Sequence, residues 1–477
     1  MRRLLPIVMA LALGVLPLAA PGSAGAAPQV ITLEGLDTVT GLQRADTNGD
    51  GVVDLLLLSG RTLVVYGLAG EGGARALSAK PRHTWTVPAE ASFVIGPHPL
   101  ERAAPKRDEV VTWLGTKGFG GPGAAALPKQ AAEANVTWRD GEQATFADFD
   151  RGTDGWVFPT AKGWLHSGGI RLDMPRMQRV KAPGPFLEDT CVVEDALSQV
   201  FVGREATGGT APAIWAIANR TLIAAGAAGR VTYDIGFLGA GDAEEWDQTL
   251  VDLDGDNRPE LLHRIESNRQ VHYGFFKTKP ATGATGPTHK PANCKLSLQG
   301  FQLDPEFVDL DGDGRKDLVI TSMQVNAANM IGALSKGLVI AETRAFLNRG
   351  AKGGPYFSAT PDANVQSEIG VKVRFNYAGN IEVIRALMIV ADGDYDGDGR
   401  KDLAIRTGPE TVRIHAGRGS GVWADAESAT TVKIPPMGDS PNVEGYAADL
   451  DGNGRDELIL VYRAPPGGKD VVRIVVP

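Results

Sequence analysis

The stretch VDLDGDGRKDLVITS, Val308–Ser322, places four aspartates among glycines directly before an apolar, strand-like run. Close relatives of this stretch recur as ADTNGDGVVD from Ala45, VDLDGDNRPE from Val251, GDYDGDGRKD from Gly393 and ADLDGNGRDE from Ala448. Five copies of so specific a pattern form an internal repeat, which indicates a repeat architecture. The chemistry of these loops and the spacing between them therefore predict how the chain folds.

Every copy has the same arrangement of oxygen-bearing side chains. Counted from the first Asp, they fall at positions one, three and five, a glycine or asparagine stands at six, and an acid stands at nine. Calcium takes six to eight oxygens at about 2.3 to 2.6 Å, and the backbone carbonyl of residue seven can supply one of them. The predicted ligands, with residue seven contributing its carbonyl, are Asp46, Asn48, Asp50, Val52 and Asp54; Asp252, Asp254, Asp256, Arg258 and Glu260; Asp309, Asp311, Asp313, Arg315 and Asp317; Asp394, Asp396, Asp398, Arg400 and Asp402; and Asp449, Asp451, Asn453, Arg455 and Glu457.

Carboxylates crowded in this way need a cation. Each pair at 4 Å repels by on the order of 4 kcal/mol at an effective dielectric constant near 20. Magnesium is the alternative metal, but it usually keeps several waters and seldom has a dedicated protein cage. We predict about five calcium ions that act as structural staples, each adding roughly 1.4 kcal/mol of stability at ten times its dissociation constant.

An EF-hand shares the first half of this loop, but it requires Glu at position twelve and a following helix. Position twelve is instead occupied by Leu57, His263, Ile320, Ile405 and Leu460. The segments that follow the loops are rich in leucine and β-branched residues, which predicts strands. Position six requires a sharp turn with positive φ, a conformation that glycine adopts freely and for which Asn257 is the best substitute.

A short strand-like segment precedes each loop, a second follows it, and a third usually comes next, as in TLVVYGL from Thr62 and TVRIHAG from Thr411. Three or four strands per repeat of this length predict a blade of a β-propeller. The sequence therefore predicts an all-β fold, a single β-propeller over residues 27–477, with the calcium-binding loops between the first and second strands of the blades.

The spacing of the loops predicts the number of blades. Asp252 and Asp309 are 57 residues apart and Asp394 and Asp449 are 55 apart, whereas Asp46 and Asp252 are 206 apart. The long gap holds four repeat lengths better than three, so three blades without the full ligand set should lie within it. We expect eight blades, with seven as the alternative. The candidate segments are Ala91–Gly115, Ala144–Ala161 and Asp189–Arg204.

Three further features complete the predicted ring. Asp148, Asp150 and Asp154 form an incomplete ligand set, which we interpret as a loop without metal. The 85 residues between Asp309 and Asp394 include a surplus that we place near 323–350, where NAANMIGALSKG is predicted to form a short helix. The C-terminal unit lacks an outer strand, and the N-terminal segment QVITLEG is predicted to supply it, which removes the unpaired edges of the ring.

With five DxDxDG-type loops that each lead into a strand, the chain resembles the FG-GAP and VCBS repeat proteins, whose propellers are related to that of the integrin α-subunit. The strong match covers only the nine-residue loops and their flanking strands. The resemblance implies a β-propeller, calcium in the loops, and roles in adhesion or ligand binding outside the cell. Because no Gly-Ala-Pro follows the second strands, the bacterial-type VCBS proteins are nearer, and integrin-like partners are not carried over.

The N-terminus has the pattern of a secretory signal peptide. Arg2 and Arg3 precede an apolar run over Leu4–Ala20, and small residues end at Ala26, after which we predict cleavage. The apolar run is shorter than the roughly 20 residues that a membrane-spanning helix needs. We therefore expect residues 1–26 to be removed, no stable membrane insertion afterwards, and a secreted protein that is extracellular or periplasmic.

Charge and cysteine content narrow the class of protein. The chain has 48 basic and 57 acidic side chains and a net charge of -9, which argues against a nucleic-acid partner because phosphate binding needs a basic face. Cys191 and Cys294 are the only cysteines, so the fold does not depend on a disulfide framework. One bridge or two buried free thiols are both compatible with the sequence.

We interpret the chain as a secreted binding module for a protein or carbohydrate ligand, without catalytic activity. The first alternative is a calcium-dependent propeller enzyme such as a polysaccharide lyase, which needs a base or a cationic cluster beside an exposed metal. No recognisable pair occurs among His83, His98, His166, His263, His272, His289 and His415. The second alternative is a structural subunit of an exported assembly, with the surplus after Met323 and the loop KTKPATGATGPTHKP as contacts. The tryptophans are candidates for stacking on sugars, although most should pack between blades; they include Trp113, Trp138, Trp156, Trp164, Trp215 and Trp423.

Overall fold

We describe the protein from a computed structural model. The described residues are 29–69, 76–87, 93–99, 108–113, 119–120, 146–147, 157–160, 163–166, 170–173, 200–218, 221–234, 245–267, 270–278, 280–282, 294–324, 326, 329, 331–332, 335, 338–350, 355–375, 381–385, 388–408, 410–418, 422–423, 429–436, 442–465 and 467–476. The predicted signal peptide, residues 1–26, and the incomplete ligand set Asp148, Asp150 and Asp154 lie outside them.

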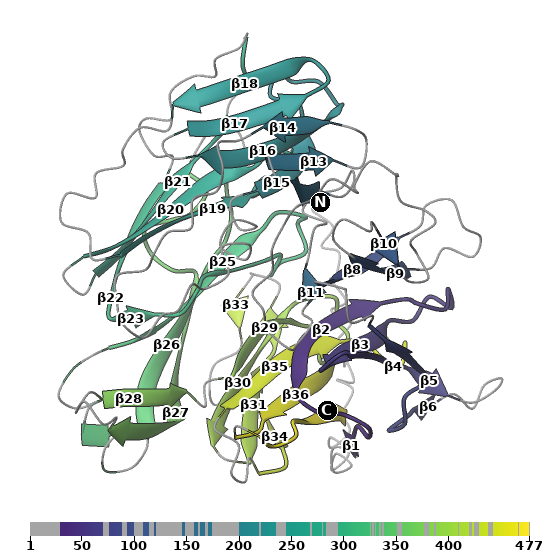
Figure 1. Ribbon diagram of the computed structural model, residues 1–477. Helices are drawn as coiled ribbons and strands as arrows, with labels where there is room; N and C mark the ends of the chain where they lie inside the picture. Colours follow the sequence, from purple (N-terminus) through teal and green to yellow (C-terminus); the bar gives the residue numbers. More distant parts are fainter. Residues whose placement is uncertain are drawn as a thin grey trace, which may run out of the picture.

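The fold is an all-β propeller, in which successive sheets follow one another along the chain (Figure 1). Six sheets have four strands. In chain order they are β2 (Val39–Ala45), β3 (Asp54–Ser59), β4 (Thr62–Tyr66) and β7 (His83–Thr86); β8 (Phe93–Pro99), β9 (Asp108–Trp113), β10 (Phe119–Gly120) and β11 (Phe146–Ala147); β15 (Val200–Arg204), β16 (Pro212–Ala218), β17 (Thr221–Gly226) and β18 (Gly229–Asp234); β19 (Glu245–Val251), β20 (Glu260–Ser267), β21 (Gln270–Phe276) and β22 (Cys294–Gln299); β29 (Ile389–Gly393), β30 (Asp402–Gly408), β31 (Thr411–His415) and β34 (Thr430–Lys433); and β35 (Asn442–Ala448), β36 (Glu457–Arg463), β37 (Val471–Val476) and β1 (Gln29–Thr32).

Two other large sheets differ from this pattern. One has three strands, β12 (Val157–Thr160), β13 (Gly163–His166) and β14 (Arg171–Asp173). The other has six strands, β23 (Phe301–Gln302), β24 (Glu306–Val308), β25 (Asp317–Met323), β26 (Leu338–Phe346), β27 (Ala363–Phe375) and β28 (Ile381–Arg385). Two small hairpins pair β5 (Leu68–Ala69) with β6 (Ala76–Leu77) and β32 (Gly417–Arg418) with β33 (Val422–Trp423).

The second strands of the blades are buried on both faces. In β3, Leu55 and Leu57 pack toward the C-terminal sheet, whereas Leu56 and Leu58 join a separate cluster with Leu63 on the other face. Strands buried on both faces are expected to be continuously apolar rather than alternating. This explains why LLLLS, LVITS and LILVY follow the acidic loops, and it confirms that strands rather than helices begin there.

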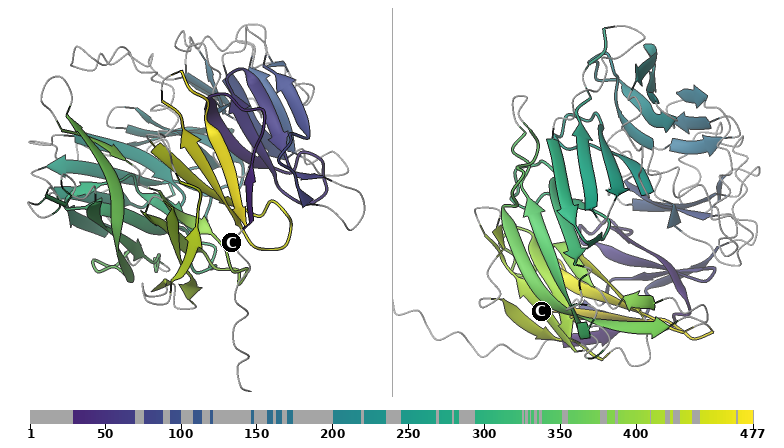
Figure 2. Two further views of the ribbon diagram at one scale, coloured as in Figure 1. Left: turned by 90° about the horizontal axis from the view of Figure 1, so that it is seen from below. Right: turned by 90° about the vertical axis from the view of Figure 1, so that its left-hand side faces the viewer.

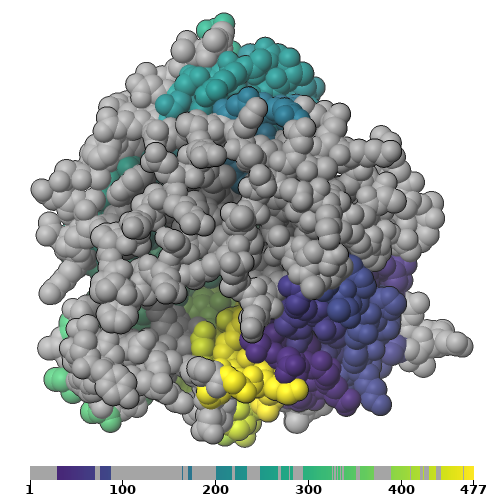
Figure 3. All heavy atoms as spheres, viewed as in Figure 1, coloured from purple at the N-terminus to yellow at the C-terminus, as the bar shows by residue number. Residues whose placement is uncertain are grey.

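The first and last sheets meet and close the ring. Strand β1 pairs antiparallel with β37, from Gln29 opposite Val476 to Thr32 opposite Arg473, which confirms the predicted closing strand. One buried cluster joins Leu57 of the first sheet to Ile459 of the last. Figure 2 shows the C-terminal strands beside the N-terminal ones, and in Figure 3 their surfaces adjoin. The hydrophobic core of this seam therefore holds together segments from opposite ends of the sequence.

Polar contacts reinforce the same seam. The buried carboxylate of Asp470 accepts hydrogen bonds from the backbone N–H groups of Val39, at 2.9 Å, and Ala464, at 2.7 Å. The Arg463 guanidinium lies 3.0 Å from the same carboxylate and also bonds Glu444 at 2.6 Å. A buried carboxylate with this many donors is fully compensated, so it can fix the orientation of the strands on both sides.

The extra residues between Asp309 and Asp394 lie only partly in the region near 323–350 where we predicted them. Within the predicted region, Leu338–Phe346 forms strand β26, and helical conformation is assigned to Asn329, Ile331, Gly332 and Ser335. Further surplus lies in β27, which has 13 residues and pairs with the additional strand β28. The alternating sequence of β27 extends the blade as a long hairpin, a feature that loop spacing alone did not reveal.

The three segments expected to hold blades without metal do contain strands, and β15 of the third begins a regular four-stranded sheet. Strand β11, from the second candidate, pairs in parallel with β8 instead of joining β12. Among the described residues, no helix is long and apolar enough to cross a membrane.

We expect Ile459→Ala to destabilise the protein by about 2–5 kcal/mol, because it removes a fully buried side chain from the cluster that closes the ring. The matched control is Ile340→Ala, since Ile340 also lies in a strand but is 50% exposed and should change stability by less than about 0.5 kcal/mol. Urea unfolding of the two variants measures the difference. Equal losses would mean that the seam does not carry the stability of the ring.

Candidate metal-binding loops

The first Asp of each loop organises the turn through its backbone contacts. In the third loop, Asp309 accepts hydrogen bonds from the N–H groups of Gly312 at 2.8 Å, Asp313 at 3.1 Å and Gly314 at 2.9 Å. Equivalent bonds to the fourth and sixth residues occur in the other four loops. The loop conformation is therefore set locally, by short-range bonds that the sequence spacing makes possible.

Two positions of every loop have positive φ. Position six does so in all five loops, and Asn257, with φ of 60°, is the single non-glycine residue with positive φ in the described part of the chain, as predicted. Position four also has positive φ, and it is a glycine in every copy, for example Gly312 at 75°. This second requirement was not predicted, although all five copies have a glycine at position four.

The acid at position nine is the most deeply buried of the acids in each loop. These five acids are at most 2% exposed and are Asp54, Glu260, Asp317, Asp402 and Glu457. Each is the first residue of the second strand of its sheet, so the loops do join first and second strands. Each also accepts a hydrogen bond from the N–H of position two, at 2.7 to 3.1 Å.

In two loops the ninth acid also contacts the end of the third strand. Asp317 accepts a bond from the N–H of Asn348 at 2.7 Å, and Asp402 accepts one from Gly417 at 2.6 Å. The amide of Asn348 continues the connection, because its Nδ2 donates to the carbonyl of Leu253 in the preceding loop at 2.6 Å. The ninth acid thus joins a loop to its own sheet, and Asn348 joins neighbouring loops.

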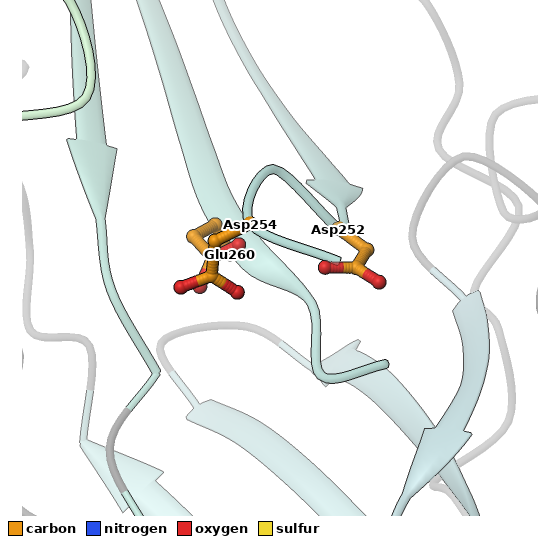
Figure 4. A group of neighbouring side chains, drawn as sticks. All are labelled: Asp252, Asp254 and Glu260. Atoms are coloured by element: carbon orange, nitrogen blue, oxygen red, sulfur yellow. The ribbon is translucent and has the colours of Figure 1, made fainter. Parts of the chain in front are cut away.

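Four loops bring the acids of positions one, three and nine together. In each group, one oxygen per residue lies within 4.8 Å of the others; the groups are Asp252, Asp254 and Glu260; Asp309, Asp311 and Asp317; Asp394, Asp396 and Asp402; and Asp449, Asp451 and Glu457. Figure 4 shows the first group, with Glu260 at the start of β20 and both aspartates on the loop. Two ligands on opposite sides of a calcium ion would be about 4.8 Å apart, so these spacings fit such an ion.

Burial without a cation changes the protonation of these acids. Desolvation raises the pKa of Asp317 and of Asp402 to about 6 and that of Glu457 to about 7, and the nearby carboxylates add to the effect. Desolvation also raises the pKa of Asp252, and it raises that of Glu260 well above its usual value. The charged form is therefore disfavoured in every group until a positive charge compensates it.

The second loop shows most directly that a cation fits. Oδ1 of Asp254 and Oε1 of Glu260 are buried and have no hydrogen-bond partner within the described residues, although the Tyr356 hydroxyl is near enough to lower the pKa of Glu260. Buried carboxylate oxygens normally find a donor or a metal. An all-oxygen donor set of this kind suits calcium better than a transition metal.

Position five is engaged differently from positions one, three and nine. Asp313 accepts a bond from the backbone N–H of Arg315 at 2.9 Å and pairs with its guanidinium. Partial burial acts to raise the pKa of Asp313, but bonding to Arg315 outweighs it and lowers the pKa. Arg258 and Arg400 pair in the same way with the fifth residues of their loops, at 3.3 and 3.1 Å. In these three loops the arginine at position seven, predicted only as a carbonyl ligand, thus neutralises the acid at position five.

The first loop differs from the other four. Its position three is Asn48, and Oδ2 of Asp54 forms an ion pair of 2.6 Å with the Arg82 guanidinium. The same guanidinium donates to the hydroxyl of Thr47 at 2.9 Å. Arg82 lies 28 residues from Asp54 in the sequence and was not identified by sequence reasoning.

Three of the predicted tryptophans and one of the two cysteines are buried in the core. Trp164, Trp215 and Trp423 are at most 4% exposed, so these three are unavailable for stacking on a sugar. Cys294 is a buried free thiol whose Sγ donates to the carbonyl of Phe357, while Cys191 lies outside the described residues. A cysteine–carbonyl contact in the core is a packing feature rather than a reactive site.

Comparison with known proteins agrees with this geometry. Residues 394–460, which include the fourth and fifth loops, match the FG-GAP-like repeat. The repeat and the arrangement of the sheets are consistent with an integrin-like propeller, as the resemblance implied. A search of curated proteins gave no match.

Three solved structures show a distant likeness. A lectin of Agrocybe aegerita, described as recognising non-reducing terminal N-acetylglucosamine, is 13% identical, with 83% of this chain and 80% of that chain covered and a TM-score of 0.36. BBS1N in complex with ARL6DN is 8% identical, with coverages of 94% and 97% and a TM-score of 0.33. Hsv2 of Kluyveromyces lactis is 10% identical, with coverages of 92% and 100% and a TM-score of 0.32.

In the presence of a chelator, we expect the protein to become more heat-stable as the pH is lowered from about 8 to about 5. The folded-state pKa values of about 6 for Asp317 and Asp402 and about 7 for Glu457 exceed the unfolded values near 4. Their stabilising contribution is fully present below about pH 4 and is lost as the pH rises through about 6 to 7.

The matched measurement repeats the melting curves in excess calcium. There the trend should reverse, because protons compete with the ion for the same carboxylates. A chelated protein whose melting temperature falls steadily over the same decrease in pH would contradict the proposed burial of unpaired acids.

Proposed function

We propose that the protein is a secreted, calcium-stabilised β-propeller that binds a protein or carbohydrate ligand and has no catalytic role. The observation that carries this proposal is the set of four acidic groups. Each group lies at the same corner of its sheet and includes a ninth acid that is almost fully buried. The FG-GAP-like repeat over residues 394–460 supports it.

Calcium in this proposal has a structural role. The ninth acid already links its loop to the second strand and, in two blades, to the end of the third strand. An ion at that acid would add the first and third residues to the same junction and neutralise the repulsion between them. Calcium would then stabilise the blade corners and leave the remaining loops free to bind a ligand.

The proposed propeller has eight blades, with seven as the alternative. The count treats the three-stranded sheet and the six-stranded sheet as blades alongside the six four-stranded ones. Supporting this, the six-stranded sheet shares buried clusters with the sheets on both sides, through Leu318 with the preceding one and Val319 with the following one. The three-stranded sheet would be a blade whose inner strand pairs elsewhere.

The binding role is argued from the architecture of the protein. Loops on a rigid all-β scaffold are a common place for recognition, because the scaffold fixes their ends while their sequences vary. Fold alone does not define a ligand. We therefore propose only the class of ligand, a protein or a carbohydrate outside the cell.

A structural subunit of an exported assembly is the second candidate. Ile331, which is 64% exposed, and Ile340, which is 50% exposed, both lie in the surplus region after Met323. The N–H of Ile340 donates to Oδ1 of Asn329 at 3.3 Å, so Ile340 is held against the segment that precedes its strand. Large apolar side chains exposed in one segment of the chain favour contact with another protein.

Calcium should raise the melting temperature of the purified protein, and Asp311→Asn should reduce that gain. One site contributes on the order of 1.4 kcal/mol at ten times its dissociation constant. Asn retains the acceptor that Asp311 offers to the backbone of Asp313, so the loss should appear only when calcium is present. Asp304→Asn is the control, because Asp304 is an exposed acid outside the loops. A melting temperature indifferent to chelation and to added calcium would contradict the metal proposal.

A screen of immobilised glycans, polyanions and extracellular proteins, with and without a chelator, tests the binding role. We expect one ligand class whose binding survives in calcium and weakens as chelation loosens the blades. The variant Ile331→Ser/Ile340→Ser should leave that binding unchanged. In the contrary outcome, the double variant abolishes capture of a single protein and no other ligand is found. That result would identify the protein as a subunit of an exported assembly and not as a binding module.

A further inference from the structure

We infer that Arg82 takes the place of a metal ion in the first acidic loop, so that this corner of the propeller is held without calcium while the other four loops depend on it. The inference rests on the proposed calcium function and divides the five loops into two kinds. It follows from a comparison of five copies of the same loop within one chain.

The first loop has fewer acids than the other loops at positions one, three and nine. The other four loops group acids from positions one, three and nine. In the first loop, position three is Asn48, so this set contains only Asp46 and Asp54. Loss of one carboxylate from the set lowers the attraction for a divalent cation and leaves less negative charge to neutralise.

Arg82 neutralises the acid that remains most buried. The Asp54 side chain is 3% exposed, and the Arg82 guanidinium contacts its Oδ2 at 2.6 Å while its own side chain is 29% exposed. The guanidinium is always charged and presents several donors in a plane, so it can bond a carboxylate and a hydroxyl together. It does so here, because the hydroxyl of Thr47 accepts its second bond at 2.9 Å.

The surroundings are adapted to this guanidinium. Position two is buried and apolar or aromatic in the other loops, as in Leu253 and Leu310, but in the first loop it is the half-buried Thr47. The backbone of Arg82 is fixed by its N–H, which donates to the carbonyl of Val65 at 2.8 Å. A Cβ at Gly67 would lie 2.0 Å from Oδ1 of Asp54 and 3.3 Å from the Arg82 guanidinium, so the missing side chain leaves room for the pair.

The second loop provides an informative contrast, because it also receives a basic side chain. Lys277 pairs with Asp254 at position three, not with the ninth acid. Glu260 therefore keeps a buried oxygen without a hydrogen-bond partner among the described residues, and its group of three acids remains complete. A cation on the acid at position three leaves the ninth acid available, whereas Arg82 occupies the ninth acid itself.

Because the first loop lies at the ring closure, the use of Arg82 in place of calcium affects how the ring is held closed. It belongs to the sheet that meets the C-terminal sheet at the ring closure, and a Cβ on Gly452 of the fifth loop would lie 2.8 Å from Val52. The seam is also held by Asp470 and Arg463 without any metal. Loss of calcium should therefore loosen the other blade corners while the ring stays closed.

The test counts the calcium bound to the folded full-length protein by equilibrium dialysis and elemental analysis. Arg82→Gln/Asn48→Asp frees Asp54 and restores the acid at position three, so we expect this variant to bind one ion more than the unchanged protein. Asp309→Asn, in the third loop, should bind one ion fewer and shows that the assay resolves a single site. An unchanged count for the double variant would mean that the first loop already holds an ion and would overturn the inference.

A second measurement separates this inference from the calcium proposal. Arg82→Gln should lower the melting temperature by the same amount in calcium and in chelator, because a protein cation is removed. A loss seen only in calcium would contradict the inference. If neither the unchanged protein nor Asp309→Asn binds any calcium, the proposed calcium function fails, and the equal loss for Arg82→Gln would still be expected.

Discussion

The structure depends on buried carboxylates at the corners of its sheets. Each ninth acid begins a second strand, is almost entirely buried, and accepts a bond from the backbone of its own loop. A carboxylate in such a place is costly unless donors or a cation surround it. This protein meets the requirement with backbone N–H groups everywhere, with a guanidinium in the first loop, and, in our proposal, with calcium in the other four. The same residue type thus joins local loop geometry to the packing of a whole blade.

Packing between sheets and bonding within loops act on different surfaces. The apolar clusters lie between neighbouring sheets, so each second strand contributes one face to each neighbour, as Leu318 and Val319 do. The acidic loops lie at the ends of these strands, and the residue at position two, such as Leu253 or Leu310, joins a loop to the apolar clusters. Charge compensation at the corners therefore acts next to the hydrophobic core, on the acids that the loop buries beside it. In this chain the ring is closed by a different means, with strand β1 and the bonds of Asp470 joining residues from opposite ends of the sequence.

Much of the loop geometry was predictable, because it depends on residues fewer than ten positions apart. Positive φ at Asn257, strands after every loop and the closing strand at Gln29–Thr32 were all predicted and are confirmed. The glycine at position four was missed although every copy contains it. The long hairpin of β27 and β28 was also missed, since an alternating segment does not show from its sequence which neighbour it will extend.

By itself, the sequence determined the repeat, the turn conformations and the order of strands, because bonds from an Asp to the next few N–H groups require only local spacing. Tertiary structure decided which charges face one another. Arg82 approaches Asp54 only once the sheet has folded, and Asn348 reaches Leu253 across 95 residues. Contacts of this kind depend on how sheets stack and where their strands end, and no local pattern records them. For that reason five similar loops in the sequence become two kinds of corner in the folded protein.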